Sequence, residues 1–167
     1  MRKPSKRSSF AIGVIAAYLI SVLTIQLASS GGPIQPEDFP ETCPENSLNC
    51  SMIGPNTYRS DGLTELRFSS SLETVMSESR YWIDSQPRTE TIGKWTDQTH
   101  SVFTSLFFRF QDDFVVKGFC EDGDAVIHVY SKSRVGISDI GANKDRVASF
   151  ASHMSNVEMA TSDCVTP

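Results

Sequence analysis

The stretch Phe114-Val-Val-Lys-Gly-Phe-Cys-Glu-Asp-Gly-Asp-Ala-Val-Ile-His-Val-Tyr-Ser-Lys-Ser133 decides the fold of this chain. Its two halves, 114–120 and 125–133, are rich in β-branched and aromatic residues, which favour strands. The Asp122-Gly123 pair between them is typical of a tight hairpin turn, because both residues tolerate the left-handed backbone that such turns need. The stretch therefore predicts two antiparallel strands.

A side-chain pattern that repeats every two residues, as in strands, begins upstream, near Arg88. It predicts two further strands, over about 89–95 and 101–110, with turns at Asp97-Gln98 and at Gln111-Asp112. Leu106, Phe108 and Phe110 are then expected on one face of the sheet, covered by helices. The other aromatic residues are also expected in the core, Tyr81, Trp82 and Trp95 among them.

Helical spacing flanks these strands on both sides. Ser70 and Glu73 form a capping-box signature, and the apolar positions that follow predict a helix over about 71–85. After the last strand, Asn143 is the expected N-cap of a second helix with apolar residues at Val147, Phe150, Ala151, Met154 and Val157. The sequence thus predicts one α+β domain over 63–160, with a four-stranded antiparallel sheet and helices packed on one face. Residues 31–62 are expected to form an extended linker and cystine arm, and 161–167 a C-terminal tail.

The N-terminus has the pattern of an export signal. Four basic residues, Arg2, Lys3, Lys6 and Arg7, precede an apolar run from Phe10 to Ala28. This run would span roughly 28 Å as a helix, close to the thickness of a bilayer core. Residues 1–30 can therefore be a single-span membrane anchor, or a signal peptide cleaved before Gly31. Either way the remainder is expected outside the cytosol, in the secretory pathway or an organelle lumen, membrane-anchored or secreted.

Charge and cysteines narrow the possible functions. Eleven basic and 20 acidic residues follow residue 30, a net charge of −9 that argues against nucleic-acid partners and against docking on anionic lipid. Four cysteines in an exported chain favour disulfides, and of the three possible pairings we expect Cys43–Cys50 and Cys120–Cys164. Their spacing suits no metal site, and nothing in the sequence indicates a cofactor. Asn49-Cys50-Ser51 matches a glycosylation acceptor.

The polar segment between the last strand and the second helix holds the candidate site residues. One hypothesis is a binding site for a small anionic ligand or an unknown protein, with Arg134 and Arg146 as donors. The other is a structural loop, in which Asp139 pairs with Arg134 and Asn143 caps the helix. The residues concerned under both hypotheses are Ser131, Ser133, Arg134, Gly136, Ser138, Asp139, Gly141, Asn143 and Arg146.

A hydrolase that uses Ser, His and Asp around residues 131–146 is the alternative function. It would draw on Asp139, on His128 or His153, and on one of the nearby serines. The sequence has no Gly-x-Ser-x-Gly elbow, and strand alternation turns His128 away from Ser131 and Ser133. We therefore expect an exported or membrane-anchored binding or accessory module without identifiable catalytic machinery.

Three blocks of the sequence resemble a known family. They are Cys43-Pro44 with Asn49-Cys50-Ser51, then Phe110-Gln111-Asp112-Asp113, and above all Ser131-x-Ser133-Arg134-x-Gly136-x-Ser138-Asp139-x-Gly141-x-Asn143-x-x-Arg146. Together they cover about 43–156 and resemble the domain of unknown function 1499 family. In that family an Arg precedes the two serines and an Ala separates them, where this chain has Tyr130 and Lys132. The resemblance implies that this chain shares the family's fold and its tendency to export. Members of the family look like membrane-associated or exported proteins of bacteria and photosynthetic eukaryotes, and the resemblance implies no reaction.

Overall fold

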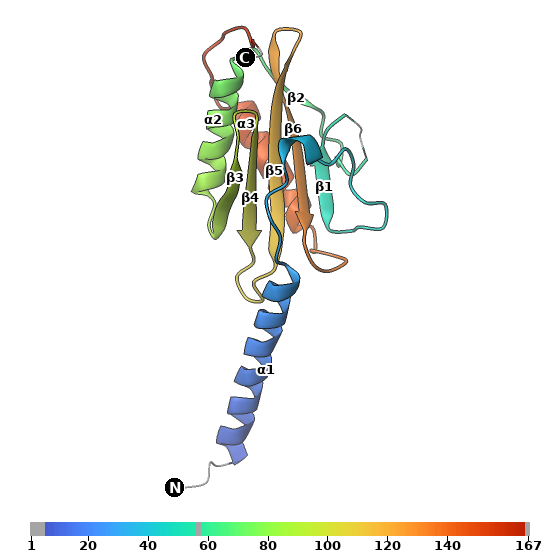
Figure 1. The fold of residues 1–167 in the computed structure, drawn as a ribbon, viewed down its shortest axis with the longest axis vertical. Helices are drawn as coiled ribbons and strands as arrows, with labels where there is room; N and C mark the ends of the chain where they lie inside the picture. Colours follow the sequence, from blue (N-terminus) through green and yellow to red (C-terminus); the bar gives the residue numbers. More distant parts are fainter. Residues whose placement is uncertain (1–5, 56–57, 166–167) are drawn as a thin grey trace.

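The computed structural model describes residues 6–55 and 58–165 and consists of one long helix followed by a single α+β domain (Figure 1). The long helix, α1 (Lys6–Ala28), points away from the domain and is long and apolar enough to cross a membrane. Arg2 and Lys3 of the basic start lie outside the described residues. After α1 the chain runs through the short 3-10 helix η1 (Pro36–Asp38) before it enters the sheet.

The domain is built on a sheet of six strands: β1 (Cys50–Ile53), β2 (Leu66–Phe68), β3 (Thr89–Lys94), β4 (Gln98–Thr104), β5 (Gln111–Glu121) and β6 (Asp124–Ser133). Their order is β1-β6-β5-β4-β3, with β2 also pairing with β6, and all these pairings are antiparallel. The α+β class is confirmed, but the expected number of four strands was too small. The two missed strands have only four and three residues: β1 is buried throughout and shows no alternation, and β2 alternates over three residues, too few to predict a strand.

One predicted strand was too long. β4 ends at Thr104 and β5 begins at Gln111, so the expected turn at Gln111-Asp112 is part of a strand. Between them, a loop is closed by Ser105, which bonds to the backbone N–H and C=O of Phe110. Leu106 and Phe108 are exposed on this loop, contrary to the expectation that they would line the core. Tyr81 is exposed as well.

Two helices, α2 (Leu72–Ser85) and α3 (Ala142–Asn156), cover one face of the sheet. The N-cap of α2 is Ser71 rather than Ser70, since the Ser71 hydroxyl accepts a hydrogen bond from the backbone N–H of Thr74. Asn143 was expected to cap α3, but Gly141, with φ of 87°, occupies that position. Asp139 replaces the missing cap side chain, because its carboxylate accepts the backbone N–H groups of Gly141 and Asn143.

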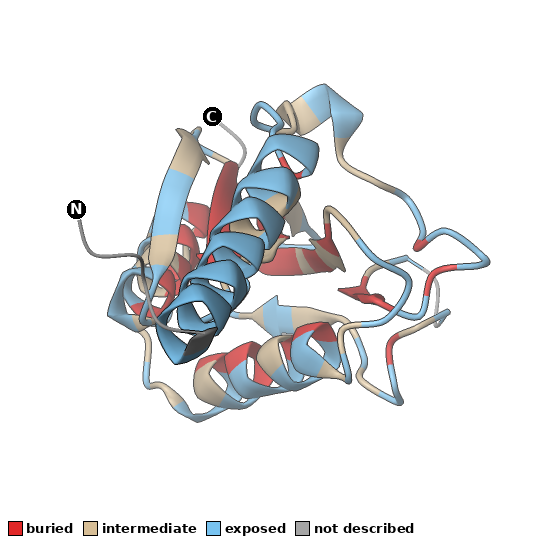
Figure 2. Cartoon of the chain, turned by 90° about the horizontal axis from the view of Figure 1, so that it is seen from below, coloured by how far each residue is buried: buried red, intermediate tan, exposed pale blue. Residues whose placement is uncertain are grey.

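Each face of the sheet has its own apolar cluster. On the helical face, aromatic rings of Trp82, Phe103, Phe114 and Phe150 pack together with aliphatic residues of α2 and α3. The opposite face carries a smaller cluster of Cys43, Cys50, Met52, Val115 and Tyr130. Ile34 and Phe39, from the segment after α1, pack against this second cluster. Figure 2 shows that α1 itself is exposed along nearly its whole length.

Two disulfides join Cys43 to Cys50 and Cys120 to Cys164, which are the pairs expected from the sequence. The first closes the segment just before β1, and the second ties the C-terminal tail to the end of β5. The backbone N–H of Cys164 also donates to the C=O of Gly123 in the β5–β6 turn. The tail is therefore held at the end of the sheet opposite α1 (Figure 1).

Candidate functional site

The segment after β6 forms a hydrogen-bonded network on the helical face of the sheet. Arg146 on α3 donates to Asp112 on β5 over 2.9 Å and to the hydroxyl of Ser131 on β6 over 3.0 Å. Ser131 in turn donates to the amide oxygen of Asn143 over 2.6 Å. The side chains of Arg146 and Asp112 are only 13% and 10% exposed, so their ion pair joins helix to sheet largely out of solvent.

Asn143 is the centre of this network. Its side chain is buried, and its amide nitrogen lies within 3.0 Å of three acceptors: the Ser133 hydroxyl, the Asp139 carboxylate and the backbone C=O of Asn49. The network therefore ties the chain before β1 to β6 and α3. The hydrogen-bonding groups of the Asn143 side chain are therefore used within the chain.

Arg134 lies on the other face and pairs with an unexpected partner. The sequence suggested Asp139, but Arg134 Nε donates to Asp113 over 2.8 Å. Its Nη2 lies 2.7 Å from the same oxygen, which is an ion-pair distance, although this N–H is not aligned for a hydrogen bond. The Nη1 group donates to the backbone C=O of Ser29 over 3.0 Å and to that of Gly31 over 3.4 Å. Arg134 thus holds the chain where it leaves α1.

His100 completes this second network. It is fully buried, its Nδ1 accepts the backbone N–H of Ile34, and its Nε2 lies 2.7 Å from Asp113. With Nδ1 accepting, Nε2 carries the proton and donates to the carboxylate. Burial alone would raise the pKa of Asp113, but the hydrogen bonds from His100 and Arg134 outweigh it and lower this pKa below its usual value.

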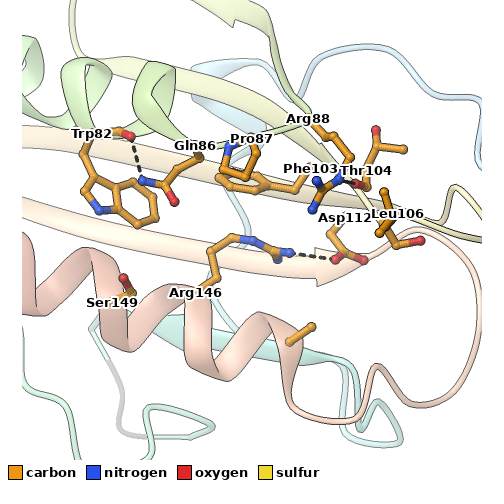
Figure 3. A pocket seen from close by; sticks show the side chains of 12 residues that line it. Trp82, Gln86, Pro87, Arg88, Phe103, Thr104, Leu106, Asp112, Arg146 and Ser149 are labelled. Carbon is orange, nitrogen blue, oxygen red and sulfur yellow. Dashed lines mark hydrogen bonds and ion pairs between the residues drawn. The ribbon is translucent and has the colours of Figure 1, made fainter.

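A cleft of about 440 Å³ opens beside the first network, between the end of α2, β4 and the first turns of α3 (Figure 3). Trp82, Pro87 and Phe103 give it apolar walls. Arg146 reaches in from α3, with its guanidinium carbon 4.4 Å from the centre of the Phe103 ring. Arg88 enters from the α2–β3 turn and donates to the backbone C=O of Thr104 over 3.1 Å. Its φ of 57° is uncommon for a residue with a side chain.

The remaining loop residues lie near this cleft. Gly136, Ser138 and Asp139 line a smaller cavity of about 150 Å³, which also borders Ser133 and Asp112. Gly136 and Gly141 both have positive φ, as the structural hypothesis requires. Ser138 accepts the backbone N–H of Ile140 over 3.4 Å. All nine residues named from the sequence therefore lie around the end of β6, but they divide between the two faces of the sheet.

The Ser, His and Asp groups of the hydrolase alternative do not meet. His128 bonds to Glu65 and His153 to Glu78, while the third histidine, His100, lies on the face opposite Ser131. Asp139 is occupied in capping α3. Among residues 6–55 and 58–165, no group of three or more His, Cys, Asp or Glu is placed to hold a metal ion.

Asn49 is enclosed in the folded chain. Its side chain is buried and its amide nitrogen donates to the backbone C=O of Gly136 over 2.7 Å. A glycan linked to this nitrogen would displace that bond and the neighbouring loop. In the folded protein, Asn49 is a structural residue of the network around Asn143.

Sequence reasoning missed several residues of these sites. Asp112 was expected in a turn and Asp113 was named as part of a family motif, although two adjacent acids at the start of a strand lie on opposite faces. Arg88 was noted only as the point where the alternating pattern begins. Its position in the cleft has no local signal, since the cleft forms between segments far apart in the sequence. His100 was not considered at all.

Comparisons with known proteins agree with the resemblance noted from the sequence. The model of a family described as "Protein of unknown function (DUF1499)" matches residues 40–154, well over half of the chain. The match includes the cleft, the first network, and Asp113, Arg134 and His100 of the second, but neither α1 nor the residues after α1 that the second network holds. Comparison with curated proteins found no significant match.

Proposed function

The chain belongs to the DUF1499 family of proteins of unknown function, and we propose that it is a membrane-anchored module that binds a small anionic ligand in the cleft between α2, β4 and α3. The observation that carries this proposal is the pair of arginines, Arg88 and Arg146, in a cleft with aromatic walls. Ligand sites commonly have this size and combine apolar walls with a few fixed polar groups.

The charges that line the cleft favour an anion. Arg88 and Arg146 contribute two positive charges and Asp112 one negative charge, so the lining is positive although the chain as a whole is acidic. Arg146 is oriented in advance by Asp112, Ser131 and Phe103, which lowers the entropy that a ligand would otherwise lose in ordering it. The ligand best suited to this lining has one carboxylate or similar anionic group and an apolar body that fits beside Trp82.

The contacts of the segment after α1 support an anchor that stays attached. Ser29 is buried, and its C=O is held by Arg134. Cleavage before Gly31 would remove this contact and free one end of a segment that otherwise covers the sheet. The basic residues before α1 and the two disulfides favour placing the domain outside the cytosol.

Binding can be tested with benzoate and its uncharged match, benzamide, on the full-length chain in detergent. Calorimetric titration should detect benzoate but not benzamide, because only the anion can pair with the arginines. The variant Arg88→Gln should lose benzoate binding. Arg67→Gln, which changes an arginine on β2 away from the cleft, is the control that should retain it. Equal responses to the two compounds, or unchanged binding by Arg88→Gln, would contradict the proposal.

A further inference from the structure

The end of the domain next to α1 carries a group of exposed apolar side chains. Leu106, Phe107 and Phe108, on the β4–β5 loop, are 59%, 70% and 49% exposed. Ile137 and Ile140, on the β6–α3 loop, are 75% and 98% exposed. These five residues are called the apolar tip. Large apolar side chains gathered at one end of a domain indicate a surface that contacts something other than water.

The two loops of the apolar tip belong to one surface. Asp112 at the start of β5 pairs with Ser133 at the end of β6, so the loops before β5 and after β6 leave the sheet at the same end. Ser105 and Gly136, one from each loop, line the same small cavity. Figure 1 shows both loops at the end from which α1 extends.

The apolar tip lies beside α1. The hydroxyl of Tyr18 donates to the backbone C=O of Phe107 over 2.8 Å, and the rings of Tyr18 and Phe108 are 6.3 Å apart. Tyr18 precedes the end of α1 at Ala28 by ten residues, or roughly 15 Å of helix. The β4–β5 loop therefore runs down along the helix and does not stop at the level where the helix ends.

We propose that the apolar tip inserts into the bilayer that α1 crosses, in the leaflet next to the domain. The apolar run of α1 is about as long as a bilayer core is thick, so a loop that reaches toward Tyr18 must enter the lipid on the exit side. Phe107 meets Tyr18 about 15 Å of helix from the end of α1, so the tip goes deeper than the roughly 5–10 Å that is usual for apolar groups at this boundary. This inference rests on the membrane anchor of the proposed function, but not on the ligand cleft.

Details of the loop suit a lipid environment. A backbone C=O in lipid requires a hydrogen-bond partner, and Tyr18 supplies one to Phe107. Ser105 and Phe110 bond to each other at the base of the loop, so the residues between them protrude as a closed unit. Ile140 has φ of 58° and its side chain is almost fully exposed. The net negative charge of the domain is no obstacle, because α1 rather than charge holds the domain at the surface.

The test uses a fluorescent probe on the full-length chain in liposomes. All four native cysteines are in disulfides, so Phe107→Cys supplies a single thiol for a polarity-sensitive dye. The control is Val165→Cys, which is similarly exposed but lies next to Cys164 at the opposite end of the domain. We expect blue-shifted emission from the probe at position 107, and loss of its intensity when the lipids carry nitroxide groups on their acyl chains, with neither effect at position 165.

Each other outcome would overturn the inference in a distinguishable way. Chains that float with the liposomes but show the same emission at both positions retain the anchor and lack the insertion. A blue shift at position 107 without quenching by the lipid nitroxides would mean that a second copy of the chain covers the tip instead. Chains that do not float would contradict both the insertion and the anchor. Benzoate titration of the same labelled chains shows separately whether the cleft binds an anion.

Discussion

The two faces of the sheet are stabilised by the same kinds of contact but by different parts of the chain. Each face has one apolar cluster, one disulfide and one Asp–Arg pair, and the acids of the two pairs are neighbours, Asp112 and Asp113. On the helical face all these contacts join elements of the domain. On the opposite face Arg134, His100 and the apolar cluster hold residues 29–39, which follow α1, and the disulfide joins Cys43 to the start of β1. Loss of a contact should therefore unfold the domain in one case and release the segment after α1 in the other.

The largest expected difference between the faces concerns the disulfides. The Cys120–Cys164 bond joins residues 44 apart and the Cys43–Cys50 bond residues 7 apart. From the loop-closure entropy of the unfolded chain, we expect replacement of both members by Ala to lower the free energy of unfolding by about 4 kcal/mol for the longer loop and about 2 kcal/mol for the shorter. Urea titrations of the two double variants in detergent measure this difference. A larger decrease in the free energy of unfolding for Cys43→Ala with Cys50→Ala would show that the segment before β1 contributes more to stability than the C-terminal tail does.

The two acids allow a more direct comparison. Asp112→Ala should lower the free energy of unfolding by about 3 kcal/mol, because it leaves Arg146 largely buried without its counter-charge. Asp113→Ala should cost about 1.5 kcal/mol, since the segment after α1 can lift away and expose Arg134 to water. Limited proteolysis within residues 29–42 should speed up for Asp113→Ala only. Equal losses with equal proteolysis would remove the distinction between the two faces.

The third comparison concerns Tyr130, on the face that residues 29–39 cover. Burial, helped by the negative charge of Asp113, raises the pKa of Tyr130 to about 12 from its usual 10.0. A raised tyrosine pKa means that the neutral form is favoured in the folded state. Its contribution to stability is complete below pH 10 and is lost as the pH rises from 10 to about 12.

Ultraviolet titration checks this expectation. The chain has four tyrosines, and the difference between its spectrum and that of Tyr130→Phe isolates the ionisation of Tyr130. The midpoint should fall in Asp113→Asn, which removes the neighbouring negative charge. A midpoint near 10 in the unmodified chain would indicate that the segment after α1 leaves the Tyr130 hydroxyl exposed to solvent.

Sequence reasoning was reliable where neighbouring residues determine the structure. The hairpin from Phe114 to Ser133 depends on strand-forming residues around Asp122-Gly123, all of which are adjacent in the chain. The helix over 72–85 likewise follows from its own apolar spacing. Sequence reasoning failed where the residues that hold an element in place are distant in the sequence. β1 consists of four buried residues with no alternation of their own, and they pair with β6, about 80 residues later.

Arg134 shows the same limit at a single side chain. Asp139 is five residues away and was the natural partner to expect, whereas Asp113 is 21 residues away. The register of β5 with β6 decides between them: Asp113 lies opposite Lys132, and the backbone N–H of Arg134 donates to Gln111. Arg134 is thereby placed beside β5, and Asp139 is left to accept the first N–H groups of α3.

The sequence by itself determined the α+β class and the apolar N-terminal helix, because these depend on local spacing and composition. Its motifs carried the resemblance to the family, and it left three cysteine pairings possible, of which the expected one was confirmed. Only the tertiary structure decided which arginine meets which acid, that the segment after α1 covers the second face of the sheet, and that Leu106 and Phe108 are exposed beside α1. The physical reason is that hydrogen bonds, ion pairs and burial arise between residues brought together by strand pairing and packing. A local sequence pattern does not specify which residues become neighbours in this way.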